Sequence, residues 1–552
     1  MCQVRGSMSD VSIDQSGSRS VASVSAPVAS ATPRSSISPF FLRAIVFVGG
    51  LTSIGIELSA ARLLAPYFGT SMFIWANLIG LTLTYLAIGY YLGGRLADRH
   101  PKPWLLFTIT AIAAFFSGII PVIAHPILIR SLSAFDRVAV GAFYGSLVGT
   151  ILLFAIPVTL LGFVTPFAIR LQMTDVHSAG ITAGNIYALS TIGSIAGSFL
   201  PVLLLIPLVG TSKTFLILSL LLMGLSFAGL IGARARWLPV IVALLAVIML
   251  ATSALAAPAH IKPAYRGQLI YEAESEYNYI QVLKDGDDTL LALNEGHAIH
   301  SIYNPNQLLT GGPWDYFMMG PFFNQHADQQ SVKNAALIGL AGGTAARQLT
   351  AAYPGIQIDG VEIDPEIVKL GRKYFGMTEP NLHVYVEDGR FFLRRTDRQY
   401  DLIAVDAYRQ PYIPFQLTSK EFFQEVSDHL TPDGAAVVNV GRTATDYRLV
   451  DVIASTMRAV YPHVYVIEVA SFTNTMVIGT KSDLTQVSNF AQNVQALPAG
   501  SVLRTVGEQS LASGEIREIP PGGTVFTDDH APVERVVDKM IIDAAREEDT
   551  AP

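Results

Sequence analysis

The sequence has almost no cysteine, few charged residues and no excess of basic ones. Cys2 is the single cysteine in 552 residues, which excludes disulfides within the chain and cysteine-based metal sites. Only 15% of the residues are charged and the formal net charge is −7, so the chain has no basic footprint for a nucleic acid. With 51% hydrophobic residues and a mean hydropathy of +0.41, it is not typical of a soluble enzyme of this size. The apolar excess predicts membrane-spanning segments.

Long apolar runs follow one another from residue 39 to residue 257. Residues 1–38 are rich in Ser, Ala and Val without periodicity, which predicts a disordered tail. Each later run can cross a bilayer at about 20 residues per helix. The sequence therefore predicts a multi-span α-helical membrane domain of about seven helices, in contact with the lipid bilayer. The expected spans are 41–65, 72–94, 104–124, 139–165, 180–208, 213–233 and 237–257; in the third, 127–132 either extends the helix or forms a re-entrant piece.

After a linker at 258–268, residues 269–330 predict a small β region. Leu269 to Leu293 alternates in the manner of a β-hairpin, with its turn at Asp285-Gly286-Asp287. Residues 331–545 then predict an α/β Rossmann-like domain, followed by a short tail at 546–552. From Asp433 to Gly479 we expect two strands and a helix that complete its sheet.

The most informative stretch runs from Ala335 to Pro365 and reads as strand, glycine turn, helix and second strand. Its turn contains Gly339, Ala341, Gly342 and Gly343, small residues that let backbone amides approach a ligand closely. Glu362 follows the second strand, where a carboxylate can accept both ribose hydroxyls of a nucleoside. This pattern predicts half of an adenosine-binding unit.

Two later strands also end in acidic residues. Asn381 to Val386 is followed by Glu387-Asp388-Gly389, where Asp388 can reach an adenine amine, and Tyr400 to Val405 is followed by Asp406. In open α/β sheets the ligand lies beyond the carboxyl ends of the parallel strands. We therefore expect these polar strand ends to line one crevice that holds an adenosyl cofactor.

Five motifs between Glu274 and Lys481 resemble the spermidine synthase (polyamine aminopropyltransferase) family, a relative of the class I methyltransferases. They are VEIDP at 361–365, EDGRFFL at 387–393, YDLIAVD at 400–406, LTSKEFF at 417–423 and LTPDG at 430–434. Together with the apolar half, the chain resembles the membrane-fused spermidine synthase-like proteins of bacteria. The resemblance implies a multi-pass protein of the bacterial inner membrane that moves an aminopropyl group from decarboxylated S-adenosylmethionine to an amine. It also implies a possible homodimer.

The resemblance assigns several site residues. Asp406 occupies the position of the catalytic Asp, which takes the amine proton or holds the cationic tail; the plainer alternative is a helix cap or a solvated strand end. Tyr277 and Asn278 stand where the family has a Tyr-Gln pair on the substrate side, and Tyr408 follows the catalytic position. Asp528 either caps the last helix or sends its carboxylate into the mouth of the site.

Three departures from the family weaken the aminopropyl interpretation. The glycine turn carries no Asp, Arg409 replaces the second Asp of the loop after the fourth strand, and Trp314-Asp315-Tyr316 replaces a Tyr-His-Glu cluster. The loss of an acidic side chain from the turn and the gain of Arg409 both disfavour a polyamine as the ligand. Arg409 instead suits a carboxylate. Two alternatives therefore stay open: an S-adenosylmethionine-dependent methyltransferase and a non-catalytic nucleoside-binding membrane protein. The acceptor is either an amine or an anionic molecule. No metal is expected, because His297 and His300 lack further ligands nearby.

The charges between the spans raise a question of topology. One side of the predicted bundle carries most of the basic residues, and the positive-inside rule makes that side cytoplasmic. With seven spans, the domain after residue 257 would then lie outside the cytoplasm, although adenosyl sulfonium cofactors are made inside. We favour a span count that is wrong by one and expect a cytoplasmic catalytic domain. The basic residues are Arg34, Arg43, Arg95, Arg99, Lys102, Arg170, Arg234 and Arg236.

Overall fold

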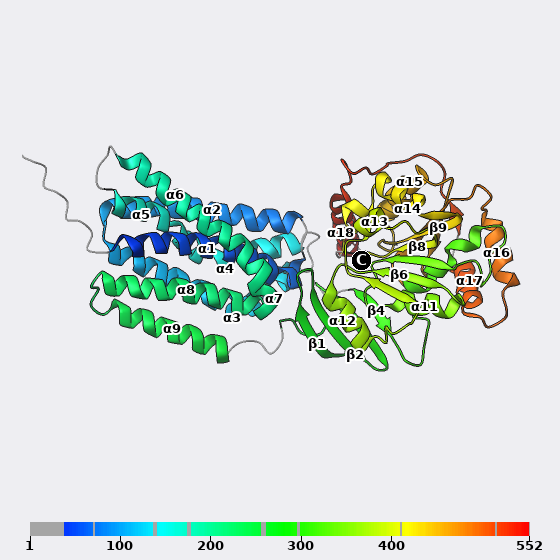
Figure 1. Cartoon of the computed structure of the whole chain (residues 1–552), viewed down its shortest axis with the longest axis horizontal. Coiled ribbons are helices and arrows are strands. Elements are labelled where there is room, and N and C mark those ends of the chain that lie inside the picture. Colours follow the sequence, from blue (N-terminus) through cyan, green and yellow to red (C-terminus); the bar gives the residue numbers. More distant parts are fainter. Residues whose placement is uncertain are drawn as a thin grey trace, which may run out of the picture. The chain divides into compact units, whose positions relative to one another are not determined.

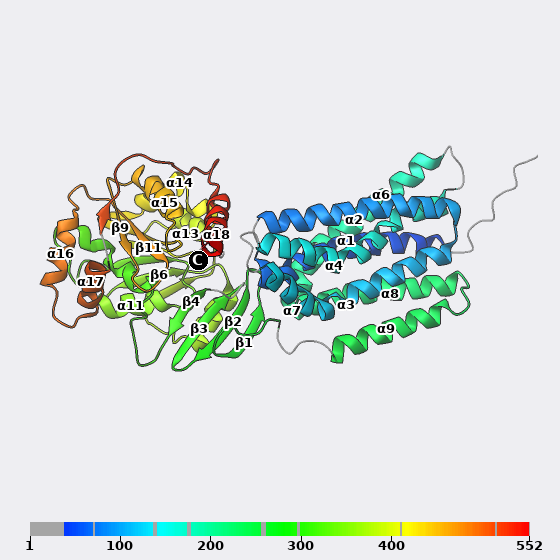
Figure 2. The same cartoon turned by 180° about the vertical axis from the view of Figure 1, so that it is seen from behind.

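A computed structural model describes most of the chain. Figures 1 and 2 show it from opposite sides, coloured along the sequence. Long helices form the first part of the chain, and an α/β part with two sheets follows. The described residues are 38–69, 72–135, 141–173, 178–255, 261–294, 298–408, 411–513 and 516–550.

The helical part has seven segments, within the described residues, that are long and apolar enough to cross a membrane. The predicted number is therefore confirmed. The third helix is continuous through residues 127–132, so the re-entrant alternative is wrong. Helices α4 and α5 form one segment, and α6, η2 and α7 form another. The bounds are α1 (Pro39–Phe68), α2 (Met72–Arg99), α3 (Pro103–Phe135), α4 (Gly141–Gly162), α5 (Val164–Gln172), α6 (Ala179–Leu200), η2 (Pro201–Leu205), α7 (Ile206–Val209), α8 (Thr211–Gly232) and α9 (Leu238–Leu255).

Glycine allows close contact between α1 and α6. A Cβ atom on Gly193 would lie 2.1 Å from the carbonyl oxygen of Phe47, and one on Gly197 would lie 2.3 Å from that of Leu51. Both distances are too short for a real Cβ, so these positions accept only glycine while the two backbones stay this close. The helices thus pack in the manner typical of membrane bundles, where small residues line the interface.

A four-stranded antiparallel sheet in the order β1-β2-β3-β4 begins the α/β part. Strands β2 and β3 form the predicted hairpin, whose turn contains Gly286 with a φ of +59°. One face of this sheet packs against α12 through Ile280 and Val282, which contact Ile367 and Leu370. The bounds are β1 (Gln268–Glu274), β2 (Tyr279–Asp285), β3 (Asp288–Leu293), β4 (Ile299–Tyr303) and α12 (Pro365–Tyr374).

The main sheet has eight strands in the order β12-β10-β11-β9-β8-β5-β6-β7. Strands β9, β8, β5, β6 and β7 are parallel, and β10 to β12 are antiparallel additions at one edge. The stretch from Asp433 to Gly479 was expected to contain two strands; it contains three, because β10 and β11 form a hairpin. The bounds are β5 (Asn334–Ile338), β6 (Gln357–Val361), β7 (Leu382–Tyr385), β8 (Tyr400–Val405), β9 (Leu430–Gly441), β10 (His463–Glu468), β11 (Asn474–Thr480) and β12 (Arg517–Glu518).

Helices cover both faces of the main sheet, as in other doubly wound α/β folds (Figure 1). Alternate residues of β8 show the two layers: Leu402 packs towards α11, α16 and α17, and Ile403 packs towards α13, α14, α15 and α18. The remaining bounds are α10 (Pro313–Tyr316), η3 (Phe317–Phe323), α11 (Thr344–Ala352), α13 (Gly389–Arg395), η4 (Phe415–Leu417), α14 (Lys420–Asp428), α15 (Arg448–Arg458), α16 (Val487–Ala496), α17 (Val502–Ala512) and α18 (Val533–Thr550). The predicted Rossmann-like architecture is confirmed.

Candidate functional site

A cavity of about 1130 Å³ lies at the carboxyl ends of the parallel strands. Its volume exceeds the roughly 300 to 1,000 Å³ of ordinary ligand pockets, so it has room for two reactants. Most of the predicted site residues line it: Tyr277, Asn278, Gly339, Ala341, Glu362, Asp388, Gly389, Asp406, Tyr408 and Asp528. Gly342 and Gly343 do not line it, and Arg409 lies outside the described residues.

The glycine turn shapes the cavity, but its amides bond within the protein. Gly339 and Leu340 both donate to the carbonyl oxygen of Val361, at 3.0 Å each. Ala341 donates to Glu362 Oε2 at 2.9 Å. The next two amides also have partners: Gly342 donates to Ser301 Oγ and Gly343 to the carbonyl oxygen of Leu340. The N–H groups of the turn are therefore already bonded, and a ligand would contact only the backbone surface at Gly339 and Ala341.

Glu362 lies at the end of β6 and is only 7% exposed. Besides Ala341, the amide of Asp364 donates to its carboxylate, at 3.1 Å from Oε1. Burial raises the pKa of Glu362 to about 7, and these backbone hydrogen bonds oppose the rise. Each carboxylate oxygen has a second lone pair, so Glu362 can still accept hydroxyl groups.

Asp388 caps α13 from the adjacent strand end. Its Oδ1 accepts from the amides of Arg390 and Phe391, each at 2.9 Å. Both bonds go to one oxygen, so Oδ2 can accept an amine of a ligand in the cavity. The cap fixes the rotamer of this carboxylate next to Gly389, which also lines the cavity.

Asp406 follows β8 at the centre of the crevice. Burial raises its pKa to about 7, and hydrogen bonds from Asn439 and Trp314 oppose the rise. Asn439 Nδ2 donates to Asp406 Oδ1 at 2.9 Å, and Asn474 Nδ2 donates to Asn439 Oδ1 at 2.9 Å. A carboxyl group with this pKa can accept a proton near neutral pH, as a general base must.

Asn439 and Trp314 were not predicted as members of the site. Asn439 is a polar residue in the apolar strand β9, in the run AAVVNVG, and a buried amide there needs partners. That polarity was the available signal. For Trp314 the available signal was its position in the Trp-Asp-Tyr cluster that replaces the family's Tyr-His-Glu cluster, although its hydrogen bond to Asp406 was not visible in the sequence.

Two predicted substrate residues have side chains that are already engaged. Asn278 donates to Asp364 Oδ2 at 2.9 Å and accepts from Asn294 at 3.0 Å. The Tyr408 hydroxyl donates to the carbonyl oxygen of Asn439 and accepts from the amide of Gly441, both at 2.9 Å. These contacts stabilise the cavity wall. The Tyr277 side chain is different, because it is 41% exposed and lines the cavity.

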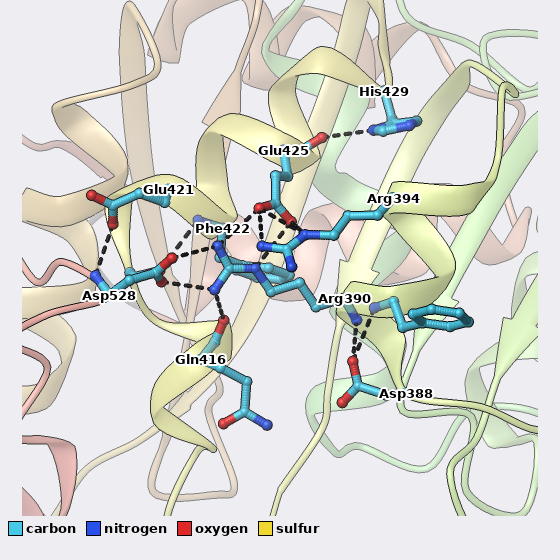
Figure 3. A network of polar contacts seen from close by, with 11 residues as sticks. Asp388, Arg390, Arg394, Gln416, Glu421, Phe422, Glu425, His429 and Asp528 are labelled. Carbon is cyan, nitrogen blue, oxygen red and sulfur yellow. Dashed lines mark hydrogen bonds and ion pairs between the residues drawn. The ribbon is translucent and has the colours of Figure 1, made fainter.

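Asp528 lines the cavity but neither caps a helix nor stands alone. Helix α18 begins only at Val533, so of the two alternatives for Asp528 the helix cap is wrong. Arg390 donates to both carboxylate oxygens of Asp528, at 2.7 and 2.8 Å (Figure 3). These bonds lower the pKa of Asp528 below its usual range. The carboxylate is thus ionised and neutralised by an arginine.

The lining of the cavity is strongly acidic. Its lining residues include one arginine, Arg535, and two histidines, His300 and His530, against eight carboxyl groups. Such a cavity attracts cations and repels anions. The eight carboxyl groups belong to Glu276, Glu362, Glu387, Asp388, Asp406, Asp528, Asp529 and Glu534.

Asp315, in the Trp-Asp-Tyr cluster, is fully buried away from the cavity. Its carboxylate accepts from Thr310, Gly311 and Gln348, so it ties the segment before η3 to α11. In the part of the chain that the structure describes, no group of three or more His, Cys, Asp or Glu side chains could hold a metal ion. His297 lies outside that part.

Comparison with known proteins gives consistent matches for this half of the chain. The family described as spermine/spermidine synthase domain matches residues 323–490. A probable polyamine aminopropyl transferase of Bifidobacterium longum is 34% identical over 323 residues, 54% of this chain and 70% of its own length. A polyamine aminopropyltransferase of Vibrio vulnificus is 30% identical over 246 residues, 42% of this chain and 77% of its own. The crystal structure of a probable spermidine synthase of Corynebacterium glutamicum aligns with a TM-score of 0.36 and 21% identity, over 46% of this chain and 98% of its own.

Proposed function

This chain belongs to the spermine/spermidine synthase family, and from that premise we propose that it is a membrane-bound aminopropyltransferase. The donor would be decarboxylated S-adenosylmethionine and the acceptor an amine. The observation that carries this proposal is the cavity itself, in which Asp406, with a pKa raised to about 7, shares a lining with seven other carboxyl groups.

The residues of the cavity fit an adenosyl donor. Glu362 would accept the ribose hydroxyls and Asp388 the adenine amine, with Gly339 and Ala341 close to the nucleoside. When bound, the donor supplies a sulfonium whose aminopropyl carbon is open to attack. The protein then has to place an amine in line behind that carbon, and such positioning supplies much of the rate.

Asp406 would remove the proton that the reaction releases. The acceptor nitrogen forms a bond to the aminopropyl carbon while the carbon–sulfur bond breaks, and the electron pair of that bond goes to sulfur. The surplus proton on nitrogen goes to the Asp406 carboxylate, which Asn439 holds in place at 2.9 Å. Because burial raises the pKa of Asp406 to about 7, its carboxylate can accept this proton near neutral pH.

The acidic lining supports a cationic acceptor such as a polyamine. Eight carboxyl groups and one arginine, Arg535, line the cavity among the described residues. Asp528 is neutralised by Arg390 and Glu387 by Arg395, but the remaining acids still outnumber Arg535, so the lining disfavours an anionic acceptor. Arg409, from which the sequence favoured an anion, lies outside the described residues. Tyr277 would contact the apolar stem of the acceptor.

Two observations favour methyl transfer as a second candidate. The glycine turn has no acid for the cationic end of a decarboxylated donor, and Arg535 in the cavity wall could pair with the carboxylate of intact S-adenosylmethionine. The two candidates differ in the released nucleoside, so a product assay separates them.

The deciding experiment incubates purified full-length protein in detergent with an amine pool and each form of the donor. Release of methylthioadenosine from the decarboxylated donor is the expected result and establishes aminopropyl transfer. Release of S-adenosylhomocysteine from the intact donor would make the protein a methyltransferase. Neither product, with both donors still bound, would indicate a non-catalytic nucleoside-binding protein.

The pH dependence follows from the raised pKa of Asp406. The ionised carboxylate is the form that accepts a proton, and burial holds its pKa at about 7. At saturating donor, kcat/KM for the acceptor should therefore rise about tenfold per pH unit up to pH 7 because of this group, beyond the rise that deprotonation of the amine itself produces. Dividing the wild-type profile by that of Asp406→Asn isolates this contribution. A ratio that does not change with pH would exclude Asp406 as the base.

We further propose that the protein is anchored in the bacterial inner membrane by its seven apolar helices, with the catalytic domain in the cytoplasm, where the donor is made. The described residues retain seven spans, so the expected miscount is not found among them. By the positive-inside rule, the basic residues between the spans therefore still favour a catalytic domain outside the cytoplasm. Lipid contact follows from the spans, and a homodimer through the soluble domain is proposed from family resemblance alone.

A further inference from the structure

Arg390 is a buried arginine behind the cavity wall. It is the second residue of α13, directly after Asp388 and Gly389, and is only 7% exposed. Its side chain does not line the cavity, but residues that it contacts do. An arginine buried to this extent is normally paired, because an unpaired buried charge is very costly.

All five N–H donors of the Arg390 guanidinium have a partner (Figure 3). Nε and Nη2 donate to the two oxygens of Glu425 on α14, at 3.0 and 2.8 Å. Nη1 and Nη2 donate to the two oxygens of Asp528, at 2.7 and 2.8 Å. Nη1 also donates to the carbonyl oxygen of Gln416, at 3.1 Å. Only arginine offers five donors in a planar fork, so lysine cannot reproduce this set.

Two of the three partners belong to separate segments of the cavity wall, and the third, Glu425, lies on α14 behind it. Gln416 and Asp528 line the cavity, and so do the neighbours of Gln416 from Tyr412 to Leu417. Asp388, at the start of the helix that carries Arg390, belongs to the donor side. Asp528 is further tied to α14, because Ser419 donates to its carboxylate and its amide donates to Glu421 at 2.9 Å. The guanidinium is thus the point where these segments meet.

We propose that Arg390 is a positioning residue, whose guanidinium fixes the segment 411–417 and Asp528 relative to the donor-binding end of the cavity. The identity of the two ends as donor and acceptor sites rests on the proposed function. Arg390 contacts neither reactant. It sets the distance between the wall that holds the amine and the helix whose cap holds the nucleoside.

Side chain and backbone of Arg390 have separate roles, which makes the inference testable. The cap at Asp388 uses the amides of residues 390 and 391, and any residue other than proline supplies these. The contacts to Gln416 and Asp528 use only the side chain. Replacing the side chain should therefore loosen the acceptor end and leave the donor end in place.

The test compares Arg390→Gln with Arg394→Gln in the full-length protein. Arg394 also pairs with Glu425, but it is 58% exposed and has no direct contact with Gln416 or Asp528 among the described contacts, so it is a matched control. Arg390→Gln should raise KM for the amine by about tenfold or more, while the dissociation constant of the donor stays within about threefold. Arg390→Lys should retain most of this defect, and Arg394→Gln should behave as wild type.

Hydrogen exchange gives a readout that does not need turnover. In Arg390→Gln, exchange should become faster in 411–417 and 526–532 but not in β5 or β8, which would exchange faster only if the whole domain were destabilised. Asp528→Asn, a milder change, should have the same pattern with a smaller amplitude. Equal weakening of donor and acceptor, or unchanged exchange in both segments, would overturn the proposal. Faster exchange without any transferase activity would instead count against the proposed function alone.

Discussion

Replacing Asp406 with asparagine is expected to lower kcat/KM for the amine by roughly 10²- to 10⁴-fold, the usual range for a positioned general base. Asparagine has nearly the same shape, and its Oδ1 can still accept from Asn439, so the geometry of the strand end should persist. What it cannot do is take the proton that the amine loses. The measurement is the rate of methylthioadenosine release by the purified protein, with Asp397→Asn, a change of an exposed carboxylate before β8, as control.

The same variant should gain stability above neutral pH. The pKa of Asp406 is raised in the fold to about 7, so its stabilising contribution is present below its ordinary pKa and is lost as pH rises through about 7. Asparagine does not ionise and avoids that loss. A lower activity together with an equal or higher Tm at pH 8 would therefore identify a functional carboxylate, whereas lower activity with lower Tm would indicate damage to the fold. If Asp406→Asn retained more than half of the wild-type activity, Asp406 would not be a general base.

The parts of the fold that were predictable from sequence depend on short-range pattern. Apolar runs of helical length predicted the number of spans. Elements β5, α11, β6 and β8 each lie within a residue or two of the predicted bounds, 335–338, 344–353, 356–361 and 400–405. These elements are regular, and their ends are marked by glycine or by acidic residues. The hairpin of β2 and β3 was predictable for the same reason, because Gly286 has the positive φ that such a turn requires.

The missed elements depend on pairing between strands. Two strands were expected between Asp433 and Gly479 and three are present; residues 469–473, which connect β10 and β11, contain neither glycine nor proline to mark a turn. Strands β1 and β4 complete the small sheet by pairing with the two sides of the predicted hairpin. An edge strand of this kind is selected by its partner rather than by its own sequence pattern.

The candidate site was predictable at its strand ends but not in its supporting contacts. Glu362, Asp388 and Asp406 follow parallel strands, and such ends must converge at one edge of the sheet. Arg390 instead meets Asp528, which is 138 residues further along the chain. No pattern in the sequence shows that contact. The same applies to Asn278, whose amide was expected to bind substrate and is held by Asp364 and Asn294.

The charge of the site also required the structure. From sequence, the one visible change near Asp406 was the gain of Arg409, which favoured an anionic ligand. The cavity collects acids from the small sheet, from three strand ends and from the segment before α18. Glu276 and Asp529 lie far apart in sequence; each is next to a predicted site residue, Tyr277 and Asp528, but neither was itself predicted to line the site. Electrostatic effects sum over all charged groups that face a cavity. A single substitution in a loop therefore does not predict the sign of the net charge of the cavity lining.

Gly339→Ala is expected to abolish most activity, through the backbone of Asp406. Gly339 has a φ of +92°, and a Cβ there would lie 2.5 Å from the carbonyl oxygen of Asp406 and 2.7 Å from the amide nitrogen of Ala407. Backbone atoms cannot yield as a flexible side chain can, so the end of β8 must move away from β5. A displacement of about 1 Å at a catalytic group costs on the order of 100-fold in rate, and we expect at least that loss in kcat/KM.

Gly355→Ala separates this displacement from backbone strain. Gly355 lies in the turn between α11 and β6 with a φ of +78°, and a Cβ there would meet no atom within 4 Å. Both variants therefore carry the cost of a left-handed conformation, about 1 to 2 kcal/mol, and only Gly339→Ala adds the clash. Both should lower Tm, but only Gly339→Ala should lose activity per folded molecule. Equal activity loss in the two variants would mean that strain alone is responsible, and normal activity of Gly339→Ala would show that the close contact between β5 and β8 does not position Asp406.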